Sequence, residues 1–381
     1  MSKVLFLNPY YYPGFRSGGP QRTVMNIADA FGEKNDIYIL TQNRDMGCSD
    51  SYDVETHKWI RVGNANVMYL PPKDYNIKFI KKYFADFDTV YSCGLFCKCT
   101  INAILLHKFN KSQKLYVAPM GVFSKAAISS KALKKRVFLF AFKHLGLFKN
   151  VIWSFTSELE LEEAKASLGD VIKEYIIAED LPRKVDFDAK IDRINSCINQ
   201  ENDVLKLVFL SRVSPKKNLE YCAQVLNDIT DKEIVFDVYG TAENEEYWDR
   251  CRKLLESLPK NIRYRYCGEV NSEKVLDVFS NYDAFLFPTK GENFGHVIYE
   301  ALAAGCIPII SDRTPWLDLN ENDCGYVWPL ENSDAFVKTI RNLTEIKTTG
   351  KFRDRKTKAL EYARGKYEKS VGESGYKILF D

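Results

Sequence analysis

No apolar run in this sequence approaches the ~20 residues that a helix needs to cross a bilayer. If the protein works at a membrane, it is therefore expected to work from the surface. The formal net charge is only +3, which does not favour binding of bulk nucleic acid. Histidine is scarce, and His57, His107, His144 and His296 form no Ser/His/Asp constellation.

The chain begins Met-Ser-Lys without the features of a signal peptide, so its ten scattered cysteines are expected to be reduced, in the cytoplasm. Cys93, Cys97 and Cys99 have C-x3-C-x-C spacing, but no second ligand pair has recognisable zinc spacing, so buried thiols are favoured. A D-x-D match at 86–88 lies just ahead of a predicted strand, where turns commonly carry Asp. The match at 186–188 is discounted similarly, and no metal site is predicted.

A length of 381 residues exceeds one ordinary core, so two domains are predicted. Short apolar segments alternate with segments of helical periodicity in both halves, which is typical of doubly wound parallel sheets. We predict an α/β fold with two Rossmann-like domains that face each other across a cleft. The first domain is expected over 1–178, a connection over 179–204, and the second domain over 205–364.

The stretch 289–312 carries the strongest chemical signal. A polar loop follows an apolar strand and leads into a helix expected to begin near Gly295 and end at Gly305. Glu292 precedes this helix and Glu300 lies in its second turn, so two carboxylates flank a helix start that favours an anion. Carboxylates bind clustered hydroxyl groups well. A phosphate beside a set of hydroxyls indicates a sugar nucleotide.

A second charged piece follows the predicted strand 205–210. Arg212 lies at the carboxyl end of that strand, and Lys217 lies five residues further on, near the next helix. Ligands of open α/β sheets sit at the carboxyl ends of strands, so both side chains are expected near the acidic stretch. An Arg and a Lys together can neutralise a diphosphate leaving group. Gly18 and Gly19, in the loop after the first strand, are candidates for close backbone approach to a ligand, with a flexible loop as the alternative.

Segment 130–149 mixes six basic residues with many aromatic and aliphatic ones. A basic amphipathic helix of this kind can lie on an anionic membrane. A helix packed on the sheet with a solvated basic edge explains the same pattern, and the sequence leaves both interpretations open.

Two motifs carry a family resemblance. The stretches Ser211-Arg-Val-Ser-Pro-Lys-Lys-Asn-Leu219 and Gly291-Glu-Asn-Phe-Gly-His-Val-Ile-Tyr-Glu-Ala-Leu-Ala-Ala-Gly305 resemble the retaining GT-B glycosyltransferases of family 4. Glu292 and Glu300 match the E-x7-E motif of that family. The resemblance extends over essentially the whole chain. It implies acceptor binding by the first domain, and a C-terminal helix at 365–381 that crosses back to that domain.

The resemblance also implies a role for each site residue. Arg212 and Lys217 would hold the donor diphosphate, Glu292 would orient the sugar, and Glu300 would bind the ribose. The remaining residues would line the donor: backbone amides of Asn293, Phe294 and Gly295 at the sugar and β-phosphate, Gly268, Glu269 and Val270 along the base, and Gly18 and Gly19 from the first domain.

The implied mechanism is front-face transfer with retention, in which the departing phosphate oxygen helps to deprotonate the acceptor. It requires no metal and no cofactor beyond the nucleotide-sugar co-substrate, expected to be a UDP- or GDP-sugar. Two departures from the family pattern stand out. Met120 replaces the His or Arg that many members carry before the Gly of the Pro-x-Gly segment. The stretch 178–182 replaces a common Asn-Gly turn.

The principal functional hypothesis is a hexosyltransferase of cell-envelope polysaccharide synthesis: capsule, O-antigen or exopolysaccharide. Segment 130–149 raises the further hypotheses of a polyprenyl-lipid-linked acceptor and of peripheral attachment to the inner face of the cell membrane. A GT-B-like epimerase or phosphorylase is an alternative, although neither cleft acid/base side chains nor a Schiff-base lysine is evident. A non-catalytic nucleotide-sugar-binding subunit is the other alternative, and Met120 keeps it open.

Overall fold

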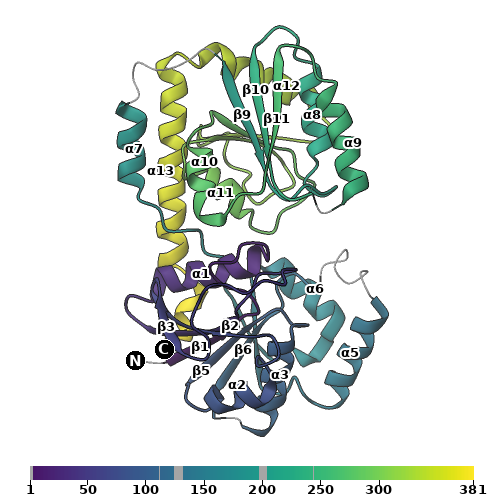
Figure 1. The fold of residues 1–381 in the computed structure, drawn as a ribbon, viewed down its shortest axis with the longest axis vertical. Coiled ribbons are helices and arrows are strands. Elements are labelled where there is room, and N and C mark those ends of the chain that lie inside the picture. Colours follow the sequence, from purple (N-terminus) through teal and green to yellow (C-terminus); the bar gives the residue numbers. More distant parts are fainter. Residues whose placement is uncertain (1–2, 111, 124–131, 197–203, 243) are drawn as a thin grey trace. The chain divides into compact units, whose positions relative to one another are not determined.

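The structure is a computed structural model that describes residues 3–110, 112–123, 132–196, 204–242 and 244–381. The chain forms two compact units (Figure 1). The first contains residues 1–184 together with 369–381, and the second contains residues 185–368. Each unit is built on its own mainly parallel sheet, which confirms the predicted pair of Rossmann-like α/β domains.

The first unit holds an eight-stranded sheet in the order β3-β4-β2-β1-β5-β6-β7-β8. All neighbouring strands are parallel except β3 and β4, which form an antiparallel hairpin. The hairpin was not predicted, although its two-residue Gly63-Asn64 connection is a typical turn signal. The strands are β1 (Lys3–Leu7), β2 (Asp36–Gln42), β3 (Trp59–Val62), β4 (Ala65–Leu70), β5 (Thr89–Cys93), β6 (Lys114–Ala118), β7 (Val151–Phe155) and β8 (Glu174–Ile177).

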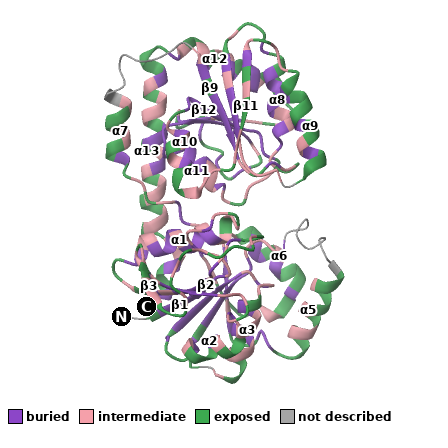
Figure 2. Ribbon diagram, in the orientation of Figure 1, coloured by how far each residue is buried: buried purple, intermediate pink, exposed green. Residues whose placement is uncertain are grey.

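This sheet has a hydrophobic core on each face, because successive side chains of a strand point to opposite faces. In β1, Val4 and Phe6 belong to one core, and Leu5 and Leu7 belong to the other. Figure 2 shows the strands buried beneath their helices. The helices are α1 (Gly19–Phe31), α2 (Ile77–Phe84), α3 (Lys98–Phe109), α5 (Ala132–His144) and α6 (Glu158–Leu168), with short 3-10 turns at Gly169–Val171 and Gly375–Leu379.

The second unit holds a parallel six-stranded sheet in the order β11-β10-β9-β12-β13-β14. Its strands are β9 (Leu205–Leu210), β10 (Ile234–Tyr239), β11 (Ile262–Gly268), β12 (Ala284–Phe287), β13 (Ile307–Ser311) and β14 (Tyr326–Trp328). Its helices are α7 (Phe187–Ser196), α8 (Leu219–Asn227), α9 (Glu245–Glu256), α10 (Val275–Phe279), α11 (His296–Leu302), α12 (Ser333–Ile346) and α13 (Gly350–Gly372), with a 3-10 turn at Ser272–Lys274.

The strand order of the second sheet places a topological switch point between β9 and β12. The chain builds outward from β9 to β10 and β11, then returns to the other side of β9 as β12. Crossovers on the two sides run in opposite directions, and ligands of open α/β sheets bind where the direction changes. The loops after β9 and β12 are the two that carry the predicted charged motifs.

The connections between the units differ in detail from the predicted boundaries. Part of the predicted connection 179–204 folds as α7, whose Phe187 packs in the core of the second unit. Helix α13 runs across the predicted boundary between residues 364 and 365 and ends at Gly372, so residues 365–381 do not form the separate C-terminal helix that was expected. The residues after α13 form the 3-10 turn Gly375–Leu379 and return to the first unit. There Tyr376 and Leu379 are fully buried in the core on the α1 face of the sheet. Among the described residues, no helix is both long and apolar enough to cross a membrane.

Candidate functional site

The loops that follow β9 and β12 lie side by side and are connected by hydrogen bonds. The two strands pair in parallel, with Ala284 opposite Leu207, so their carboxyl ends emerge side by side. The Lys290 N–H donates to the Lys216 carbonyl at 2.8 Å, which ties one loop to the other. Asn218 adds a buried link, because its side-chain amide donates to the Pro288 carbonyl at 2.9 Å. Its left-handed backbone (φ 63°) is one that Asn tolerates better than most residues.

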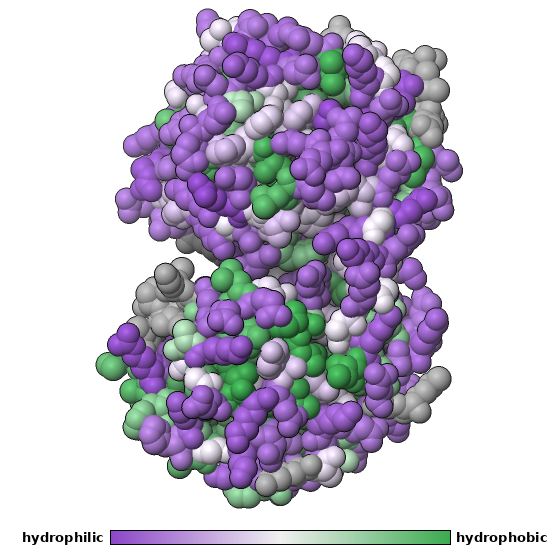
Figure 3. All heavy atoms as spheres, turned by 180° about the vertical axis from the view of Figure 1, so that it is seen from behind, coloured by the Kyte–Doolittle hydropathy of each residue, from purple (hydrophilic) through white to green (hydrophobic). Residues whose placement is uncertain are grey.

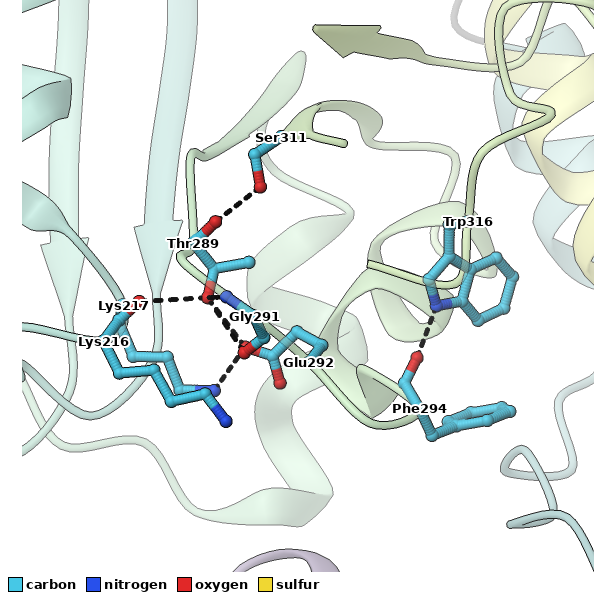
Figure 4. A network of polar contacts seen from close by, with 8 residues as sticks. All are labelled: Lys216, Lys217, Thr289, Gly291, Glu292, Phe294, Ser311 and Trp316. Carbon is cyan, nitrogen blue, oxygen red and sulfur yellow. Dashed lines mark hydrogen bonds and ion pairs between the residues drawn. The ribbon is translucent and has the colours of Figure 1, made fainter. Parts of the chain in front are cut away.

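An ion pair lies between these loops. Lys217 Nζ is 2.5 Å from Glu292 Oε1, and the two side chains are only 13% and 10% exposed (Figure 4). Burial lowers the pKa of Lys217; Glu292 opposes this shift, while the charges of Lys216 and Arg212 reinforce it. Arg212 itself is exposed at the end of β9. The structure thus brings Arg212, Lys217 and Glu292 together. Three cations, Arg212, Lys216 and Lys217, accompany the one carboxylate of Glu292, so positive charge predominates.

Two buried hydroxyl groups fix the carboxylate. Thr289 Oγ1 donates to Glu292 Oε1 at 3.0 Å, and Ser311 Oγ donates to the Thr289 carbonyl at 2.5 Å (Figure 4). Both residues are completely buried. The Glu292 N–H donates to the Arg313 carbonyl at 3.1 Å, so the acid is held through its backbone as well. Sequence reasoning missed Thr289 and Ser311, although hydroxyl residues directly at the ends of neighbouring strands were the available signal.

The helix after the acidic loop is shorter than predicted. It covers His296–Leu302, and Gly295 precedes it in a left-handed conformation (φ 79°). A Cβ at Gly295 would lie 3.0 Å from Ile298 Cδ1 and 3.4 Å from Trp316 Nε1. Trp316 is buried and donates to the Phe294 carbonyl at 2.5 Å (Figure 4), so its indole shapes the loop. Asn293 is exposed beside this loop, whereas Glu300 is 3% exposed within α11.

The residues predicted along the nucleotide base lie at the carboxyl end of β11, the edge strand. Gly268 has φ 74° and accepts a hydrogen bond from the Gly240 N–H at 2.8 Å. Glu269 is exposed, and Val270 packs partly against the core of the unit. Strands β10 and β9 separate β11 from β12, so these residues flank the Lys217–Glu292 pair along one sheet edge.

The predicted glycine pair belongs to the first unit. Gly18 (φ 73°) precedes α1, and a Cβ at Gly18 or Gly19 would meet nothing within 4 Å. Packing within the chain therefore does not require glycine at Gly19. Met120 also has a left-handed backbone, with φ 60°.

The discounted metal motifs have ordinary structural surroundings. Cys93 and Cys99 are buried, and burial raises the pKa of each thiol. Asp88 accepts a hydrogen bond from the Lys3 N–H at 3.2 Å. Within the described part of the chain, no group of three or more His, Cys, Asp or Glu side chains is arranged to hold a metal ion.

Thr289 offers a test of whether carboxylate positioning matters. Thr289→Val removes the hydroxyl that donates to Glu292 while keeping the side-chain shape, and Thr289→Ser retains the hydroxyl. Loss of one hydrogen bond to a charged group costs about 1.5–3 kcal/mol, so we expect Thr289→Val to weaken the sugar transfer that the sequence resemblance implies roughly 10-fold or more. Thr289→Ser should stay within about 3-fold of wild type. Steady-state rates of both variants measure the effect, and equal thermal melting temperatures exclude misfolding as its cause. Equal losses of rate in both variants would exclude a role for the hydroxyl.

This chain is similar in sequence to several known proteins. Residues 192–364 match the family model described as glycosyl transferases group 1. An uncharacterized 41.2 kDa protein in the cps region of Klebsiella pneumoniae is 22% identical over 313 residues, which cover 80% of this chain and 81% of that protein. A glycogen synthase of Fusobacterium nucleatum is 24% identical over 173 residues, covering 44% of this chain and 34% of the synthase.

The solved structure of Anabaena Alr3699/HepE in complex with UDP and glucose has a TM-score of 0.70 to this chain, with 13% identity over 99% of this chain and 98% of that one. The chain has the GT-B fold. In this GT-B chain, the part matched by the family model contains both loops of the Lys217–Glu292 site. Residues 1–191, including Gly18 and Gly19, lie outside that match.

Proposed function

We propose that this protein is a retaining glycosyltransferase that moves a hexosyl group from a UDP- or GDP-sugar to a glycan acceptor, in cell-envelope polysaccharide synthesis. The observation that carries the proposal is the buried Lys217–Glu292 pair at the switch point between β9 and β12. A cation and an acid held together at a ligand-binding sheet edge suit a diphosphate joined to a polyhydroxyl sugar.

The chemistry follows from the charges. Lys217 and exposed Arg212 neutralise the diphosphate as its bond to the anomeric carbon breaks. Glu292, fixed by Thr289, accepts hydroxyl hydrogens of the sugar and aims the anomeric carbon. The acceptor oxygen bonds to that carbon on the face that the phosphate leaves, and its proton passes to the departing phosphate oxygen. Glu300 would bind the ribose, and the amides of Asn293–Gly295 the sugar and β-phosphate.

The cations of the site could also replace a metal ion in stabilising the leaving group. Arg212, Lys216 and Lys217 gather at the loop where the leaving group would sit, and each supplies positive charge without a metal. We propose metal-independent transfer, so the rate should be unchanged by a chelator. A loss of activity with EDTA, restored by a divalent cation, would contradict this part of the proposal.

The relatives support the choice of substrate class. The Klebsiella relative is named for its place in a cps region, which favours a capsule-type glycan, and the Anabaena structure contains UDP and glucose, which favours a UDP-sugar. The first experiment is thermal-shift screening against UDP, GDP, ADP and their sugars, since a ligand that binds the folded state raises its apparent stability. Transfer of a labelled sugar from the stabilising donor, with lost transfer in Glu292→Ala, is the expected result. Binding without transfer over a broad acceptor panel would favour a non-catalytic subunit.

Lys217 gives this proposal a pH signature. Its pKa is lowered from an ordinary 10.5, so it loses its charge at a lower pH than a solvated lysine. UDP affinity should therefore fall as pH rises from about 7.5 to about 10, whereas Lys217→Arg should keep its affinity, because a guanidinium stays charged throughout this range. Stability has the opposite sign: the unfolded chain binds the extra proton, so this residue favours folding more as pH rises. Calorimetric titration across the range checks the affinity; parallel pH profiles of the two proteins would contradict the assignment.

A further inference from the structure

One stretch of the first unit is free of acidic residues. Between Asp88 and Glu158 the sequence contains eleven Lys and Arg residues and no Asp or Glu. The whole chain carries only +3, so the rest of it has more acidic than basic residues. Most of these cations lie in described residues on or beside α3 and α5. This part of the first unit therefore has a strong local positive charge that the net charge conceals.

Helix α5 is apolar on two opposite faces. Its inner face packs on the core through Phe138 and Phe142, whose rings stack with centroids 4.0 Å apart. Its outer face presents Leu133, Val137 and Phe140, which are 77%, 60% and 64% exposed. These outer positions follow the i, i+4, i+7 spacing of one helical stripe. A helix that needed only to cover the sheet would carry polar residues on this outer side.

Cations flank the outer stripe on both sides. At 100° per residue, Lys134 lies on one side of it, and Arg136 and Lys143 lie on the other. All three are exposed, and Lys143 Nζ also donates to the Leu168 carbonyl at the end of α6 at 3.3 Å. Long basic side chains beside an apolar stripe can reach headgroup phosphates while the stripe enters the acyl boundary. Figure 2 shows the exposed outer side of α5, and Figure 3 shows apolar side chains at the margin of the same unit where α5 lies.

The apolar surface continues beyond the helix. Leu145 follows α5 and is 60% exposed, and Phe109, the last residue of α3, is 85% exposed. The end of α3 is linked to the end of α5 here, because Lys108 Nζ donates to the Leu145 carbonyl at 3.1 Å. The α5 surface is thus defined by the apolar residues Phe109, Leu133, Val137, Phe140 and Leu145 and the basic residues Lys108, Lys134, Arg136, Lys143 and Lys149.

We propose that the α5 surface docks the protein on a phospholipid bilayer with anionic headgroups. The cations of a stretch that carries no acid between Asp88 and Glu158 match the negative surface of such a bilayer, and the central apolar stripe matches its acyl boundary. Nucleic acid would match the charge but not a solvent-facing Leu–Val–Phe stripe, since its surface is phosphate. An acidic protein partner is the other occupant, and the test below distinguishes it. This inference concerns where the enzyme works and does not rest on the proposed transfer reaction.

The test is sedimentation of the full chain with vesicles of phosphatidylcholine containing 0 or about 40% phosphatidylglycerol, at about 0.1 M salt. The wild type should bind the anionic vesicles at least 10-fold more tightly than the neutral ones. Lys134→Glu/Arg136→Glu/Lys143→Glu should lose most of this binding, and Val137→Asp/Phe140→Asp should lose it without changing a basic residue. The charge control is Lys253→Glu/Lys260→Glu/Lys338→Glu, three exposed positions of the second unit, and the apolar control is exposed Leu317→Asp.

Several outcomes would overturn the proposal. The wild type could fail to bind anionic vesicles, or the control triple variant could lose binding to the same extent, which would reduce the effect to net charge. The wild type could instead bind a polyglutamate column or an oligonucleotide but not the vesicles. If that binding were lost in both sets of α5 variants, the surface would be assigned to another partner. Unchanged thermal melting of the α5 variants excludes misfolding as the cause of lost binding.

Discussion

Replacing Glu292 with glutamine is expected to lower the kcat/KM of sugar transfer by roughly 10²–10³-fold, because it removes an oriented charge from the reacting centre. The change has a second consequence. Glu292 is the group that raises the otherwise depressed pKa of Lys217, so its neutralisation favours loss of the lysine charge as well. Initial rates with the donor identified by thermal shift measure the effect.

The matched control for this prediction is Glu321→Gln, which neutralises an exposed carboxylate of the same unit. This control should transfer sugar within about 2-fold of wild type, as expected for a surface substitution. Glu292→Gln with near-normal transfer would remove the acid from the mechanism. Lost transfer in both variants would point instead to a general effect of charge.

Gly240→Ala is expected to produce the second large effect, because it should disturb both the stability of the fold and the position of the site. Gly240 directly follows β10 with φ 139°, and a Cβ there would lie 1.7 Å from the Ser211 carbonyl oxygen. The obstruction is backbone, and it immediately precedes Arg212, so the β9 loop would have to move. We expect the free energy of unfolding to fall by about 2–4 kcal/mol and nucleotide binding to be lost.

Denaturant unfolding and calorimetric titration with UDP test this prediction together. The control is Gly350→Ala at the start of α13, where an added Cβ would meet nothing within 4 Å. Because alanine is the better helix former, the control should be neutral or slightly more stable. A Gly240→Ala protein as stable as this control would show that the β9 loop tolerates displacement.

Much of the site could be predicted from the sequence because its chemistry sits at strand ends. Arg212 and Lys217 follow one apolar strand and Glu292 follows another, and parallel sheets bring such ends to one edge. This property of parallel sheets predicts that the charged groups lie near each other, but not which of them form an ion pair. It did not predict that Lys217 pairs with Glu292 at 2.5 Å across 75 positions of sequence.

Other features were beyond local patterns. The positioning of Glu292 by Thr289 and Ser311 depends on the directions of two hydroxyl groups at the ends of two neighbouring strands, and sequence spacing does not encode those directions. Strand β3 is half-exposed and lies at a sheet edge, so it lacks the strong alternation that marks other strands. The buried residues of helix α13 are Phe352, Ala359, Leu360 and Ala363, so its apolar pattern does not mark an end at Gly372.

The outward stripe of α5 illustrates the same limit. The sequence predicted an amphipathic basic segment but could not show which apolar residues pack inward. The structure assigns Phe138 and Phe142 to the core and leaves Val137 and Phe140 exposed. This division turns an open alternative into a surface with defined variants and controls.

The central claim is that a nucleotide-sugar is held at the Lys217–Glu292 pair, and hydrogen–deuterium exchange in the presence of saturating UDP, GDP or ADP tests it most directly. The nucleotide that binds should slow amide exchange in the loops 211–218 and 289–300, and Lys217→Ala should abolish that protection. Saturable nucleotide binding that protects other segments and leaves both loops unchanged would contradict the claim, as would the absence of binding by all three nucleotides.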